Sequence, residues 1–129
     1  MPKPIIVLVV DDERLLDQLA GDLERRFGED YRVLAERSPT EAVPVIEQLA
    51  DPVALVVAAR HMGELDGLGL LERARELHPS AKRVLLEHRG EWTSGQPVVR
   101  AMTLGQVDYV LFRPWLPREQ FLYLSLIHI

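Results

Sequence analysis

Residues 5–13 read Ile-Ile-Val-Leu-Val-Val-Asp-Asp-Glu, and this stretch decides the fold. The apolar run Ile5–Val10, mostly β-branched, predicts a strand covered on both faces, as in a parallel sheet. The run is too short to span a bilayer, and it ends in acids where a secretory signal would end in small residues. We therefore expect a mature chain that begins with a buried strand and has two carboxylates, Asp11 and Asp12, at the strand's carboxyl end.

Strands and amphipathic helices alternate outward from this first strand. Ser38 and Glu41 form a Ser-x-x-Glu capping box at the start of the second helix, and Pro44 should disturb only the first turns of that helix. The remaining strands are expected at residues 31–35, 53–58, 84–86 and 107–112, the helices at 15–27, from 39, at 68–77, near 98–104 and from 118, and a loop at 61–67. This alternation predicts a single domain of the α/β class, a doubly wound parallel sheet with helices on both faces.

Composition limits the function classes. The 129 residues are 47% hydrophobic, which suits one domain with one core. The net charge of -5 argues against broad binding to nucleic acid or to an acidic membrane. There is no cysteine, so a disulfide, a thiolate metal site and a cysteine nucleophile are excluded, and the composition is compatible with a reducing cytosol.

Charged side chains follow the predicted strands, where open parallel sheets bind their ligands. Asp11 and Asp12 follow the first strand, Ala59 the third, Glu87 the fourth and Arg113 the fifth. Adjacent carboxylates repel unless a cation or a basic side chain lies between them, and Mg²⁺ suits their oxygen atoms. The structural alternative is that the two acids favour the start of the following helix through its dipole.

Three motifs lie in order on these elements. They are Val9–Glu13 (VVDDE), His61–Gly67 (HMGELDG) and Arg113–Pro114. With them the chain resembles, over nearly its whole length, the CheY-like receiver domains of bacterial response regulators, whose motifs are an acidic pair, a Met-Pro-x-Met-Asp-Gly loop and a Lys-Pro. The resemblance implies a flavodoxin-like (βα)5 fold with strand order 2-1-3-4-5.

The resemblance also implies a mechanism, and the chain departs from it at most reactive positions. In receivers a carboxylate on the third strand accepts a phosphoryl group, Mg²⁺ held by the acidic pair neutralises it, and a lysine on the fifth strand stabilises the product. A hydroxyl on the fourth strand and an aromatic side chain on the fifth then move. Here the phosphoacceptor position falls on Ala59, the hydroxyl on Glu87, the aromatic on Val110, the lysine on Arg113 and the loop proline on Gly63.

No register slip restores a nucleophile, because residues 54–62 contain neither Asp nor Glu. A methyl group cannot form an acyl phosphate. The expected protein is therefore a phosphorylation-incompetent pseudo-receiver with no catalytic residue, in which Asp11 and Asp12 bind Mg²⁺ weakly at best.

The remaining charges suggest a different use of the pocket. Arg113 can form an ion pair with Glu87 or Asp12 that fixes one conformation without phosphate. The alternative is that Glu87 and Arg113 point into water. His61 and His88 with Asp12 could ligate a transition metal, although histidines on such a rim are more often solvated.

The leading hypothesis for function is a cytoplasmic module of two-component, phosphorelay signal transduction that acts through protein contacts and is not an enzyme. Its partner would be a sensor kinase or a fused or downstream output domain, with no nucleic acid or membrane partner. The face made by the fourth helix, fifth strand and fifth helix is the expected contact surface and a possible dimer interface.

Two alternatives stay open. Residues 81–86, Asp108-Tyr109 and 113–115 resemble receivers found before thioredoxin-reductase-like flavoproteins, so the chain could be the regulatory N-terminal module of a truncated FAD/NAD(P)-dependent oxidoreductase. It could also be a conventional phosphorylated response regulator, if the position of Ala59 has been assigned wrongly.

The end of the chain departs from the pattern. Residues 124–129, Leu-Ser-Leu-Ile-His-Ile, resemble the translated end of a sequencing adapter, so we expect residues 1–123 to be the receiver domain, with its last helix truncated. The alternative is an apolar helix docked on the sheet or on a partner.

Overall fold

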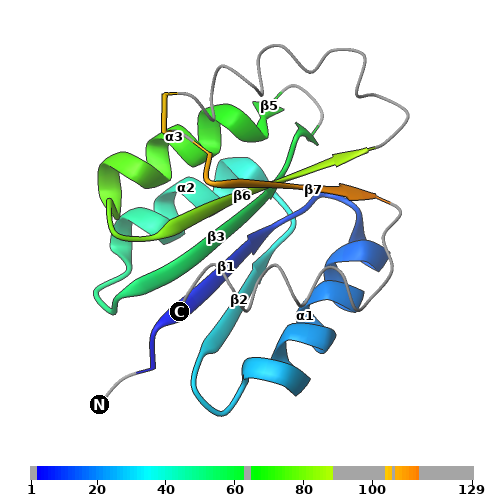
Figure 1. Cartoon of the computed structure of the whole chain (residues 1–129), viewed down its shortest axis with the longest axis vertical. Coiled ribbons are helices and arrows are strands. Elements are labelled where there is room, and N and C mark those ends of the chain that lie inside the picture. The colour runs from blue at the N-terminus through cyan, green and yellow to red at the C-terminus, as the bar shows by residue number, and fades with distance from the viewer. Residues whose placement is uncertain (1–2, 63–64, 89–103, 106, 114–129) are drawn as a thin grey trace.

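A parallel sheet of five strands organises the chain in a computed structural model, which describes residues 3–62, 65–88, 104–105 and 107–113 (Figure 1). The elements are β1 (Ile5–Val9), α1 (Glu13–Phe27), β2 (Arg32–Glu36), α2 (Pro39–Gln48), β3 (Val53–Ala59), β4 (His61–Met62), β5 (Leu65–Asp66), α3 (Gly67–Leu77), β6 (Lys82–His88) and β7 (Tyr109–Arg113). The fourth and fifth expected helices and the tail at 124–129 lie outside the described residues.

The sheet has the order β2-β1-β3-β6-β7, with every neighbouring pair parallel. Without the two short strands β4 and β5, this is the predicted order 2-1-3-4-5, so the doubly wound, flavodoxin-like class is confirmed. All five side chains of β1 are buried because β1 lies between β2 and β3 and is covered on both faces, as its continuous apolar sequence predicted.

Helices cover both faces of the sheet. In Figure 1, α1 lies on one face, and α2 and α3 lie side by side on the other. Arg73 of α3 joins the two helices on that face through a hydrogen bond to Glu47 of α2, and it also bonds Glu76 one turn further along α3. These two bonds raise the pKa of the Arg73 guanidinium.

Three local predictions need correction. Residues 61–66 are not a plain loop: His61 pairs with Asp66 and Met62 with Leu65 in an antiparallel hairpin. The predicted capping box does not form, because the Ser38 side chain makes no hydrogen bond that caps the helix. The Glu41 N–H donates to the backbone oxygen of Ser38, and the Ser38 hydroxyl lies 2.8 Å from Thr40 Oγ1. The fourth strand is longer than residues 84–86, because β6 extends to Lys82 and His88 through backbone pairing with β3 and β7.

Candidate functional site

The predicted site residues meet at the carboxyl edge of the sheet. Ala59 ends β3 and pairs with Leu86 of β6, and Glu87 follows Leu86 on the same strand. Arg113 ends β7 opposite His88. The acid pair follows β1, the strand next to β3.

The acid pair is exposed, and one member already has a structural role. Asp12 is the N-cap of α1, and its Oδ1 accepts a hydrogen bond from the backbone N–H of Leu15 at 3.2 Å. Asp12 therefore stabilises the start of α1, which is the structural role considered above as the alternative to metal binding. Within the part of the chain that the structure describes, no group of three or more His, Cys, Asp or Glu side chains gathers as a metal site would need.

Ala59 lies buried at the tip of the central strand, against the start of α3. A Cβ built on Gly67, the first residue of α3, would lie 2.1 Å from the Ala59 carbonyl oxygen. Glycine is thus needed at position 67 for the helix to approach the strand so closely. The methyl group of Ala59 offers no oxygen atom at this point.

Arg60, the next residue, is the main feature that sequence reasoning missed. Its side chain is 7% exposed, and its Nη1 donates to Glu87 Oε2 at 3.0 Å. Its Nε lies 3.4 Å from Asp66 Oδ1. Its backbone N–H donates to the Leu86 oxygen, and its own oxygen accepts from Gly67 N–H, both at 2.8 Å.

Glu87 does not point into water: its side chain is 1% exposed and Arg60 is one of its partners. A carboxylate so far from water needs a cation or several donors, and Arg60 supplies a cation. The side chains of Arg113, His61 and His88 lie outside the described residues, so the Arg113 ion pair and the histidine metal site stay predictions. Val110 is partly buried in β7, paired with Leu85.

A signal for Arg60 existed in the sequence. An arginine directly after the apolar run Val53–Ala59 is unusual, because a charge at the end of a buried strand needs a partner. The partner, Glu87, is 27 positions away, and the pairing of β3 with β6 brings the two together.

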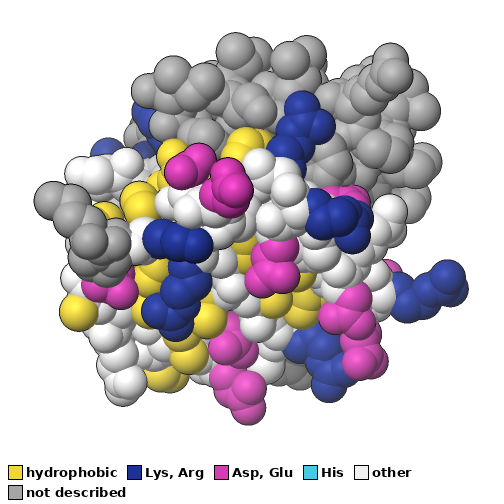
Figure 2. Space-filling model, turned by 90° about the horizontal axis from the view of Figure 1, so that it is seen from below, with side chains coloured by type: hydrophobic (Ala, Val, Ile, Leu, Met, Phe, Trp, Pro, Cys, Tyr) yellow, Lys and Arg dark blue, Asp and Glu magenta, His cyan; other side chains and the backbone are white. Residues whose placement is uncertain are grey.

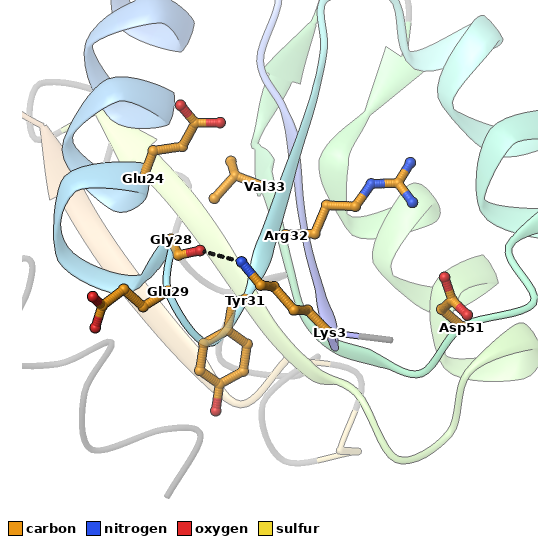
Figure 3. Close-up of a pocket in the computed structure, with 8 residues that line it drawn as sticks. All are labelled: Lys3, Glu24, Gly28, Glu29, Tyr31, Arg32, Val33 and Asp51. Atoms are coloured by element: carbon orange, nitrogen blue, oxygen red, sulfur yellow. Dashed lines mark hydrogen bonds between the residues drawn. The ribbon is translucent and has the colours of Figure 1, made fainter. Parts of the chain in front are cut away.

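A hollow at the opposite, amino edge of the sheet contains none of the predicted site residues. Its volume is about 790 Å³, and it lies beside the end of α1 and the start of β2 (Figure 3). It is lined by Lys3, Glu24, Gly28, Glu29, Tyr31, Arg32, Val33 and Asp51. Lys3 Nζ donates to the Gly28 oxygen at 2.9 Å, and the charges around the hollow are of both signs.

Charges of both signs cover the outer surface shown in Figure 2. On this face, basic and acidic side chains lie intermingled over the described part, so neither sign dominates it. None of the described helices combines the length and the apolar character that crossing a membrane requires.

Comparison with solved structures shows which known domains share this fold. The signal receiver domain of an HD domain-containing protein from Pseudomonas fluorescens Pf-5 is 28% identical, with a TM-score of 0.80, over 98% of this chain and 88% of that chain. The non-phosphorylated HemR receiver domain from Leptospira biflexa is 25% identical, with a TM-score of 0.77, over 97% of this chain and 94% of that one.

A CheY-like response regulator receiver domain protein from Methanospirillum hungatei JF-1 is 24% identical, with a TM-score of 0.79, over 96% of this chain and 92% of that one. Neither a protein-family model nor a curated protein sequence matches the chain. The structural neighbours confirm the resemblance seen in the motifs: the chain has the CheY-like fold of response regulator receiver domains.

Proposed function

We propose that this domain is a pseudo-receiver, a two-component signalling module that acts through protein contacts and accepts no phosphoryl group itself. The observation that carries the proposal is the buried methyl group of Ala59 at the tip of β3, where receivers have an aspartate.

The chemistry of the acceptor supports this proposal. An acyl phosphate forms when a carboxylate oxygen attacks phosphorus and the leaving group departs with its electron pair. A methyl group has no lone pair for the attack. The acids that Arg60 contacts near this point, Glu87 and Asp66, already face its guanidinium, which lowers their nucleophilicity.

Mg²⁺ does not fit the described residues well. Asp11 and Asp12 would be its protein ligands, but position 59 lacks the carboxylate that would complete the set, and Asp12 caps α1. We propose that any Mg²⁺ binding is weak, and no step of the proposed function depends on it.

The partner is proposed from the fold class. Receiver domains act on proteins, and a sensor kinase or a fused or downstream output domain is the partner that the resemblance favours. The proposed contact surface consists of β7 and the fourth and fifth helices that the receiver fold implies. The same surface would form the interface of a dimer. A cytoplasmic location is part of this proposal.

The test is exposure of the full chain to acetyl phosphate with Mg²⁺, followed by intact mass and peptide mapping. No stoichiometric adduct is expected on the native chain. The positive control is the triple variant Ala59→Asp, Glu87→Thr, Arg113→Lys, which restores three receiver positions and should gain one phosphoryl group on Asp. A stoichiometric adduct on any carboxylate of the native chain would overturn the proposal.

A further inference from the structure

We propose that Arg60 is a positioning residue that holds Glu87 inward and locks the site in one arrangement without phosphate. The inference rests on the proposed function, since Glu87 occupies the position from which a receiver signals. It adds a specific device: an internal guanidinium that permanently supplies the charge partner of that position.

The first support is that Arg60 joins three elements. Its backbone N–H binds β6 at Leu86, and its carbonyl binds the first N–H of α3 at Gly67. Its side chain binds β6 again at Glu87 and approaches Asp66, the N-cap of α3. One residue therefore sets the carboxyl ends of β3 and β6 and the start of α3 relative to each other.

The second support is burial. The Arg60 and Glu87 side chains are 7% and 1% exposed. An arrangement in which Glu87 has swung away would leave the buried Arg60 guanidinium without this carboxylate, so that arrangement is disfavoured. The state with Glu87 inward is therefore the populated one.

The third support is the Asp66 carboxylate, which two groups share. Asp66 Oδ1 accepts from the Leu68 N–H at 2.9 Å and caps α3, while it also lies 3.4 Å from Arg60 Nε. That Nε is buried and has no hydrogen bond of its own. The start of α3 is thus coupled to the same guanidinium that holds Glu87.

The chain also provides a matched control arginine. Arg83 is nearly as buried, and its Nε likewise lacks a hydrogen bond, but its Nη atoms donate to the carbonyl oxygens of Ala81 and Gly105. It lies at the other end of β6. Its removal should disturb that end and leave the proposed lock intact.

The experiment compares backbone amide NMR spectra and hydrogen exchange of the full chain with those of Arg60→Met, Glu87→Gln and the control Arg83→Met. The native chain should show one set of amide signals at residues 66–68 and 86–88. Both Arg60→Met and Glu87→Gln should double or broaden these signals and raise exchange at Gly67 and Leu68 at least about tenfold relative to β1, the factor that 1.4 kcal/mol represents. Arg83→Met should change signals near residues 105 and 108 instead.

Three results would overturn the inference: native signals already doubled, variant signals at 66–68 and 86–88 that match the native ones, or equal changes there in Arg83→Met. Glu87→Gln keeps the shape of the side chain, so it carries the test if Arg60→Met does not fold. An acetyl phosphate adduct would refute the proposed function without changing these spectra, so the two failures are distinguishable.

Discussion

Two buried arginines lie at opposite ends of the sheet, and their partners differ. At the carboxyl end, Arg60 faces the carboxylates of Glu87 and Asp66. At the amino end, Arg83 donates to two backbone oxygens, with the Asp108 carboxylate 3.7 Å away. Backbone carbonyl groups stay in place whichever side chains surround them, so Arg83 holds two backbone segments together. Arg60, in contrast, binds carboxylate side chains that could move.

The difference teaches that burial of an arginine does not by itself mark a functional site. Asp108 also accepts from the backbone N–H of Arg83 and is about one quarter exposed, so water can replace part of its contacts. Glu87 has almost no access to water. The charge of Arg60 is therefore harder to replace than that of Arg83, and substitutions at the two ends should have unequal effects.

The largest effect is expected for Arg60→Met. Taking the cation from a carboxylate that stays buried should lower the free energy of unfolding by about 3–5 kcal/mol. Urea denaturation at neutral pH followed by circular dichroism measures it. The double variant Arg60→Met, Glu87→Met should recover much of the loss, because it removes both charges of this pair; equal losses in the single and double variants would contradict this explanation.

Gly67→Ala should cost somewhat less, about 3 kcal/mol, at the upper end of the range for overpacking. Its new methyl group would meet the Ala59 carbonyl at the contact that brings α3 against β3. The matched control is Gly69→Ala in the same helix, where a Cβ meets nothing within 4 Å. The control should gain about 0.5–1 kcal/mol from helix propensity, and similar melting shifts of the same sign in both variants would refute the close contact.

Arg83→Met is expected to cost about 1–2 kcal/mol, because two carbonyl oxygens lose their donors and water can reach some of the vacated space. The same urea titration measures it. A loss as large as that of Arg60→Met would remove the contrast between the two ends of the sheet.

The smallest effect belongs to Lys3→Met, also at the amino end. The Lys3 ammonium group donates to the carbonyl oxygen of Gly28, the C-cap residue of α1, so its loss should cost about 0.3–1 kcal/mol through the helix dipole. Added salt should weaken this contribution in the native chain, since the contact is exposed. A melting temperature that falls equally in both proteins as salt is added would argue against an electrostatic origin.

Much of the fold could be predicted from the chain. The apolar run before Asp11 and the alternation of strands and helices predicted the parallel sheet, because local periodicity reports burial directly. The resemblance to receiver domains predicted the order of the strands. The hairpin β4-β5 was missed because two-residue strands carry too little pattern to detect. The length of β6 was underestimated because Lys82 and His88 look like loop residues until their backbones pair with neighbouring strands.

The candidate site was predicted in part. Ala59, Glu87 and Arg113 were all expected at strand ends, and the structure places them at the same edge. Arg60 could not be predicted from the receiver motifs, because those motifs do not include the residue that directly follows the third strand. Whether Arg113 also reaches Glu87 stays a prediction.

By itself, the sequence determined that the first strand is buried, that acids follow it, and that a methyl group, that of Ala59, stands at the end of the third strand. These are properties of residue type and of short-range order, and they hold in any conformation of the rest. Only the tertiary structure decided that Arg60 and Glu87 form a pair, because the choice of partner for a buried charge depends on which strands lie side by side. That choice is made by the packing of the whole sheet.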